Sequence, residues 1–129
     1  MSLSPKLVND FGIWLDDALL AAADTSAQAF NFNLYQAAET WDVELIGADE
    51  FDDASPDLAC DPVFSYPELF FIPQSLVGVQ WEKGLATALD LVILYIRGGR
   101  QRDVLRSSIA VGVGFVDGDL TIVWPESAA

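Results

Sequence analysis

The stretch that decides the fold is Val111-Gly-Val-Gly-Phe-Val-Asp-Gly-Asp-Leu-Thr-Ile-Val-Trp124. Its Asp117-Gly118 dipeptide is a strong signal for a two-residue turn between antiparallel strands. Such a turn predicts four strand pairs: Val116 with Asp119, Phe115 with Leu120, Val113 with Ile122, and Val111 with Trp124. Because side chains alternate along a strand, this register places the large apolar groups on one face. We therefore expect Val113, Phe115, Leu120 and Ile122 to face the helices.

The two glycines of this stretch, Gly112 and Gly114, bear a superficial likeness to a dinucleotide-binding loop. That loop requires a third glycine and a helix N-terminus beneath the pyrophosphate. Here the third glycine is missing and a second strand follows. Glycines inside a strand instead favour the close approach of another backbone or a helix to the sheet.

Two further strands are predicted upstream, because apolar residues alternate with polar ones over residues 30–34 and 41–45. Their outer face carries Asn31, Asn33, Tyr35, Asp42 and Glu44, which we take as candidate binding residues. Asp42 and Glu44 lie roughly 6–7 Å apart along one strand, a spacing that would suit a glycosidase carboxylate pair. Alternate acids are, however, what a solvent-facing strand shows without catalysis, and we predict no catalytic residue.

Two helices bracket these elements. Ser4-Pro5 is typical of a helix start, and a stripe of three- and four-residue steps follows it: Leu7, Phe11, Leu15, Ala18, Leu19 and Ala22. The second helix spans 81–97 and ends at Gly98-Gly99. Its main buried stripe is expected to be Leu85, Leu89, Val92, Ile93 and Ile96. Leu91, Leu94 and Tyr95 point elsewhere and need a cover, either residues 63–72 or a second copy of the chain.

The segment from 48 to 80 is rich in proline yet contains many large apolar side chains, which predicts an ordered segment that wraps the domain. Residues 70–72 are expected to form a short edge strand. We thus predict one α+β domain over residues 1–129, with a mainly antiparallel sheet of four to five strands and two helices on one face. The predicted order is α-β-β-(long segment)-α-β-β.

Charge and composition exclude several functions. The chain has 129 residues, a net charge of −14 and no histidine, and from Leu7 to Glu82 it carries fifteen carboxylates and no basic side chain. Histidine-based triads and histidine-ligated zinc are therefore excluded. Nucleic acid is a poor partner for so acidic a molecule. Cys60 is alone and has no histidine to activate it, so we expect it to be inert. We predict no cofactor.

Two charged clusters are further candidates for binding. Asp49, Glu50, Asp52 and Asp53 could hold calcium or magnesium, but their spacing does not match the twelve-residue calcium loop, and a solvated acidic loop with no metal is the preferred interpretation. Arg97, Arg100, Arg102 and Arg106 follow a helix C-terminus. They either stabilise the helix dipole or form an anion or partner site.

In size and charge the chain resembles small acidic inhibitors, antitoxins and immunity proteins. This resemblance implies a non-catalytic protein that blocks a basic protein partner by charge-steered association. The alternative is a small enzyme or ligand-binding domain that uses surface carboxylates and the Arg97–Arg106 cluster. We expect a cytoplasmic protein of bacterial type with no signal peptide and no membrane span, and we leave a homodimer open.

Overall fold

The computed structural model describes residues 3–50, 62–116 and 118–125, which form an α+β fold of six strands and four helices. The elements in chain order are α1 (Pro5–Ala22), β1 (Ala29–Gln36), β2 (Thr40–Ala48), β3 (Phe64–Ser65), β4 (Phe70–Pro73), α2 (Gln74–Val77), α3 (Trp81–Gly98), α4 (Arg102–Arg106), β5 (Ala110–Phe115) and β6 (Thr121–Trp124).

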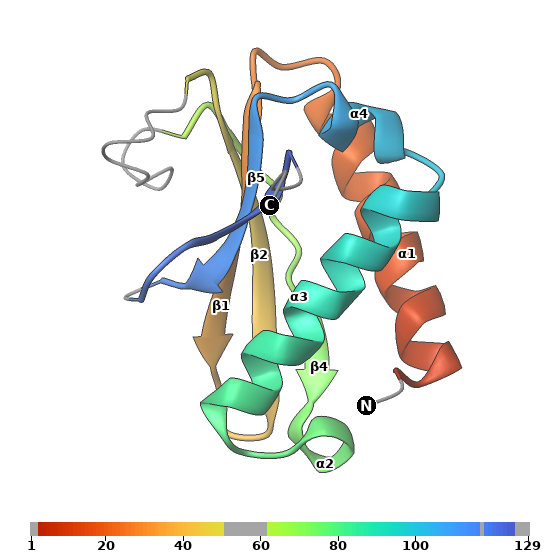
Figure 1. Ribbon diagram of the computed structural model, residues 1–129, viewed down its shortest axis with the longest axis vertical. Coiled ribbons are helices and arrows are strands. Elements are labelled where there is room, and N and C mark those ends of the chain that lie inside the picture. Colours follow the sequence, from red (N-terminus) through yellow and green to blue (C-terminus); the bar gives the residue numbers. More distant parts are fainter. Residues whose placement is uncertain (1–2, 51–61, 117, 126–129) are drawn as a thin grey trace.

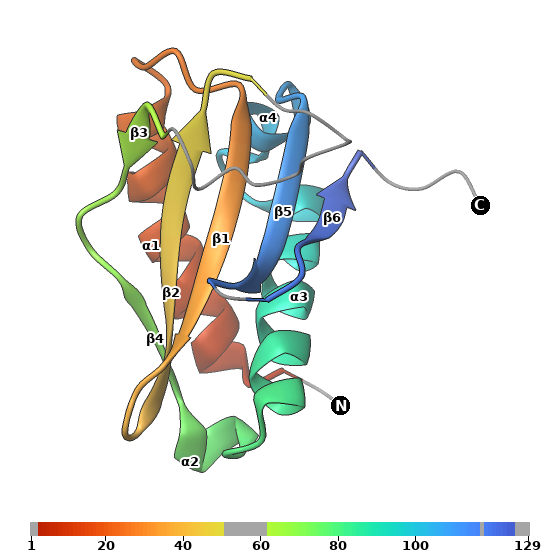
Figure 2. The same ribbon diagram turned by 90° about the vertical axis from the view of Figure 1, so that its left-hand side faces the viewer.

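The sheet is backed by helices on one side only. Its strand order is β3-β2-β1-β5-β6, and β4 pairs with the same edge of β2 as β3 does. The long helices α1 and α3 lie together on one face (Figure 1). Turned by 90°, the molecule presents the opposite face of the sheet, with both long helices behind it (Figure 2). We call this opposite side the helix-free face.

Four of the five strand pairings in the described residues are antiparallel as expected, but β1 and β5 pair in parallel, so the sheet is mixed, and it has six strands instead of four to five. The reason is the connection between β4 and β5. Both strands run in the same direction, since β4 is antiparallel to β2 and β2 is antiparallel to β1. Helix α3 carries the chain back along the sheet, as a crossover between parallel strands must. Strand β3 and the two short helices α2 and α4 were absent from the prediction.

Helix α1 forms as its sequence predicts. The Ser4 side chain accepts a hydrogen bond from the Leu7 backbone N–H, and Pro5 occupies the first turn, where its missing N–H leaves no bond unmade. All six residues of the predicted stripe are buried. They pack on the apolar face of the sheet, which includes Phe32, Leu34 and Val43. The core therefore lies between the helices and one face of the sheet.

The segment before α3 extends the sheet rather than covering α3. Strand β4 confirms the predicted edge strand and pairs with β2. Phe70 packs edge-on against Phe11 of α1, and Trp14 of α1 contacts the rings of Phe70 and Tyr66. The prediction that residues 63–72 cover the second side of α3 is thus wrong. Helix α1 lies on that side, so Leu91 and Tyr95 are buried while Ile93 is only half-buried.

The final hairpin confirms one part of the predicted register and corrects the rest. Val111 pairs with Trp124 as expected, but a β-bulge shifts the next pairs by one residue. Val113 and Phe115 face the helices as predicted. The expectation for the other two residues is wrong, since Leu120 packs near Ala29 and Ala48 on the helix-free face and Ile122 is exposed.

Gly112 and Gly114 explain the altered path of this hairpin. A Cβ on Gly114 would lie 2.5 Å from the Asp119 carbonyl oxygen, and one on Gly112 would lie 2.7 Å from the Leu120 side chain. The glycines therefore let residues 119–120 cross close above the sheet, as the sequence indicated.

Candidate functional site

Four polar side chains line up on the helix-free face, and we call them the polar ladder. They are Asn31, Asn33 and Tyr35 of β1 and Glu44 of β2. Alternation places the three β1 residues on one face, opposite Phe32 and Leu34. The antiparallel register sets Asn33 directly across from Glu44. Sequence and register together bring these groups within hydrogen-bonding reach.

The hydrogen bonds of the polar ladder run in one donor-to-acceptor order, from Asn31 through Asn33 to Glu44. Glu44 Oε1 accepts hydrogen bonds from the Tyr35 hydroxyl at 2.8 Å and from Asn33 Nδ2 at 3.4 Å. Because a carboxylate only accepts, it turns the amide of Asn33 so that Oδ1 points toward Asn31, and Asn31 Nδ2 donates to it. The Oδ1 of Asn31 is then left as the terminal acceptor. It is buried and has no hydrogen-bond partner within the described ranges.

Of the remaining acidic candidates, Asp42 lies across from Tyr35 on the same face as the polar ladder, and Asp49 and Glu50 lie farther along the chain. Asp42 is half-buried on β2 and accepts a hydrogen bond from the Thr40 hydroxyl at 2.6 Å. Asp49 and Glu50 are exposed just beyond the end of β2. Asp52 and Asp53 lie outside the described residues. Within those residues, no group of three or more Cys, Asp or Glu side chains is placed to hold a metal ion.

The arginines divide into two pairs with different surroundings. Arg102 donates to the Gly99 carbonyl oxygen, and Arg106 donates to the carbonyls of Ile96 and Arg97. These bonds satisfy backbone acceptors at the C-terminus of α3, where positive charge is favoured. Arg97 and Arg100 are exposed instead. The interpretation of this cluster as stabilising the helix end therefore holds for Arg102 and Arg106.

Basic and acidic side chains are unevenly distributed over the described residues. The helices and the Gly99–Gln101 corner contain all six basic residues, together with six acidic residues: Asp10, Asp16, Asp17, Glu82, Asp90 and Asp103. Six against six leaves this helical layer with no net charge. Outside this layer the described residues contain eight acidic side chains, two of them on β2, and no basic one.

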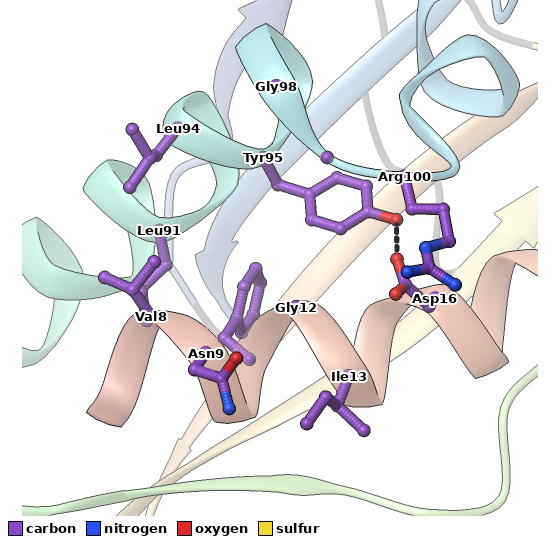
Figure 3. A pocket seen from close by; sticks show the side chains of 12 residues that line it. Val8, Asn9, Gly12, Ile13, Asp16, Leu91, Leu94, Tyr95, Gly98 and Arg100 are labelled. Atoms are coloured by element: carbon purple, nitrogen blue, oxygen red, sulfur yellow. Dashed lines mark hydrogen bonds between the residues drawn. The ribbon is translucent and has the colours of Figure 1, made fainter. Parts of the chain in front are cut away.

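A groove between α1 and α3 forms a second candidate site, with a volume of about 440 Å³ (Figure 3). Val8, Ile13, Leu91 and Leu94 give it apolar walls. At one end the Tyr95 hydroxyl donates to Asp16 Oδ1, and it accepts from the Gln101 backbone N–H at 2.9 Å. Arg100 lines the same end (Figure 3).

Tyr95 links the groove to the stability of the fold. Burial raises the pKa of Tyr95 well above its ordinary value of 10.0, and the hydrogen bond to Asp16 adds to the rise. A raised folded-state pKa gives stability that is present below the unfolded pKa and is lost as pH rises above it. We therefore expect the wild-type protein to lose stability above about pH 10.

Replacing Tyr95 by Phe should remove this part of the alkaline loss, because the phenol no longer titrates. At neutral pH the Tyr95→Phe variant should be less stable by about 1 kcal/mol, through the lost hydrogen bonds. Urea unfolding at pH 7 and above pH 10 measures both effects. The difference between the two pH profiles isolates Tyr95, because every other residue is the same in the two proteins. Parallel pH profiles for the two proteins would contradict this assignment.

Sequence reasoning missed the groove almost entirely, since Arg100 is the one candidate residue from the sequence that lines it. Gly12 in the middle of α1 was the available signal, because glycine weakens a helix interior and needs a reason to be there. A Cβ at Gly12 would meet no atom within 4 Å, so the glycine borders open space.

Comparison of the chain with protein-family models, with curated proteins and with solved structures finds no match. None of the helices in the described ranges is long and apolar enough to cross a membrane.

Proposed function

We propose that this chain is a non-catalytic, inhibitor-type binding protein that captures a basic protein on the helix-free face of its sheet. The observation that carries the proposal is the polar ladder. It presents the half-buried Glu44 carboxylate, held by hydrogen bonds from Tyr35 and Asn33, on the face that no described helix covers.

The distribution of charge supports the same face. Every strand lacks lysine and arginine, whereas the helical layer contains all six basic residues. A basic partner is therefore attracted to the sheet side of the molecule and meets a nearly neutral surface on the helical side. Complementary potentials of this kind accelerate association and orient the two proteins. Phosphate-rich nucleic acid is repelled by the same charge.

The chemistry of the polar ladder defines what the partner supplies. Glu44 and Asp42, two residues apart on β2, both offer carboxylate oxygens on this face. Arginine and lysine side chains carry several N–H donors and no acceptor, so they complement such a surface. Charge-assisted hydrogen bonds to the carboxylates would then hold the complex more strongly than neutral ones.

Affinity capture from the native cell tests the proposal with two matched double variants. Asp42→Asn with Glu44→Gln removes two charges from the helix-free face but keeps an acceptor oxygen in each side chain. Glu82→Gln with Asp90→Asn removes two charges from α3. We expect the wild type to retain a basic protein, the first variant to bind it at least about tenfold more weakly, and the second to bind it nearly as the wild type does.

Salt supplies a further check on the same complex, because raising the ionic strength should weaken a charge-steered association. Retention of an acidic or neutral protein instead would contradict the proposal. So would an equal loss of affinity in both double variants, since that result would show that only the total charge of the molecule matters.

A further inference from the structure

We propose that a second copy of this chain docks on the groove between α1 and α3 to form a two-fold symmetric dimer. The inference is independent of the basic partner, because it uses the helical layer rather than the helix-free face. It rests on the shape of the groove, on its charges and on the charge of the rest of the molecule.

The helical face carries both an exposed apolar side chain and hollows in which the same side chain of a second copy can fit. Besides the hollow of about 440 Å³, a second hollow of about 430 Å³ lies next to it, and Val8 and Leu94 line both. Leu94 is 44% exposed and stands between the hollows. In a two-fold interface each copy offers the same patch, so the Leu94 ridge of one copy can enter a hollow of the other, and the reverse.

The hollows have room for such a side chain. Gly12 and Gly98 line the first hollow, and a Cβ at either position would meet no atom within 4 Å. Ile13, which also lines it, is 57% exposed. Burying these apolar groups against a second copy would remove them from water, which is the main source of favourable free energy in association.

The charges of this face are self-complementary. The first hollow carries Asp16 and Arg100, and the second carries Asp90 and Arg97. Each hollow therefore holds one acid and one base, an arrangement that a two-fold axis can match with itself. The helical layer as a whole has six acids and six bases, whereas the other described residues contain eight acids and no base. Two copies repel each other least when they meet through their helices.

Light scattering at low micromolar concentration tests the proposal with three variants. Leu94→Asp removes the ridge, and Gly12→Leu adds an apolar side chain to the first hollow at a position where an added Cβ meets no atom within 4 Å. Leu76→Asp is the matched control, because Leu76 lies on α2 outside both hollows and is 54% exposed. We expect twice the chain mass of 14.0 kDa for the wild type and for Leu76→Asp. The Leu94→Asp and Gly12→Leu variants should scatter as single chains.

Far-UV circular dichroism verifies that each variant is folded, and Gly12→Leu keeps the test decisive if Leu94→Asp does not fold. A wild-type protein that scatters as a single chain, at both low and high salt, would overturn the proposal. A wild-type dimer that persists in both groove variants would also overturn it, since that dimer would use another face.

Discussion

Replacing Trp41 by alanine should lower the free energy of unfolding by about 3–5 kcal/mol, the range for truncating a buried aromatic side chain. Trp41 on β2 is fully buried. Its ring meets Phe115 edge-on with the centroids 5.8 Å apart, and its Nε1 donates to the Gly78 carbonyl oxygen at 2.9 Å. The variant loses the buried area and the hydrogen bond, and it leaves a cavity between the sheet and α3.

Trp81→Ala is the matched control for this prediction. Trp81 also meets the Phe115 ring edge-on, at 6.2 Å, but it is 56% exposed. Its truncation should cost about 1–2 kcal/mol, clearly less than that of Trp41, because more than half of its surface stays in water on folding. Urea unfolding of both variants measures the difference. Equal losses would show that Trp41 does not anchor the core.

Substituting Gly84 by alanine should destabilise the fold by about 1–3 kcal/mol through overpacking, although alanine favours helices. A Cβ on Gly84 would lie 2.6 Å from Cδ2 of Trp41, whose indole is fully buried. Gly12→Ala on α1 is the control. Its added methyl group meets no atom, so it should stabilise the protein by roughly 0.5–1 kcal/mol.

A double-mutant cycle identifies the cause of the Gly84 effect. If the clash with the indole is responsible, the cost of Gly84→Ala should shrink in a Trp41→Phe background, because the smaller ring leaves room for the methyl group. Denaturant midpoints of the four proteins give the coupling energy. An unchanged cost in the Trp41→Phe background would assign the destabilisation to another contact.

The sequence predicted those features of the structure that depend only on residues within one helix or strand. The stripe from Leu7 to Ala22 predicted α1, and Gly98-Gly99 predicted the end of α3, whose last residue is Gly98. At Gly99 a Cβ would lie 2.6 Å from the Tyr95 ring, so the glycine also permits the close approach of that ring. Periodicity and capping are properties of neighbours in the chain.

The arrangement of these elements depends on contacts that periodicity does not encode. The sequence predicted two hairpins but not that β5 would add beside β1 in parallel. The bulge between Val111 and Gly112 moved Leu120 to the other face, because one extra backbone residue reverses the alternation that follows. Which side of α3 is buried depends on where α1 packs. Tyr95, expected to lie off the buried stripe, is therefore buried, whereas Ile93, expected on that stripe, is only half-buried.

The candidate site could likewise be predicted from the sequence only in part. Alternation along the strands placed Asn31, Asn33, Tyr35 and Glu44 on one face, and the structure brings them into one hydrogen-bonded series. The direction of that series could not be predicted, because it requires the β1–β2 register and the carboxylate that orients the amides. The groove was equally inaccessible, since its walls come from two helices that are far apart in the sequence.

The side-chain amide signals of Asn31 and Asn33 provide the most direct test of the proposed binding face. We would titrate isotope-labelled protein with an oligoarginine peptide and follow all backbone and side-chain amides by NMR. The account predicts that the two side-chain amides and the β1 and β2 backbone shift first, while α1 and α3 stay unchanged, and that Asp42→Asn with Glu44→Gln suppresses the response. Shifts that are centred on α1 and α3, or that persist undiminished in the double variant, would contradict it.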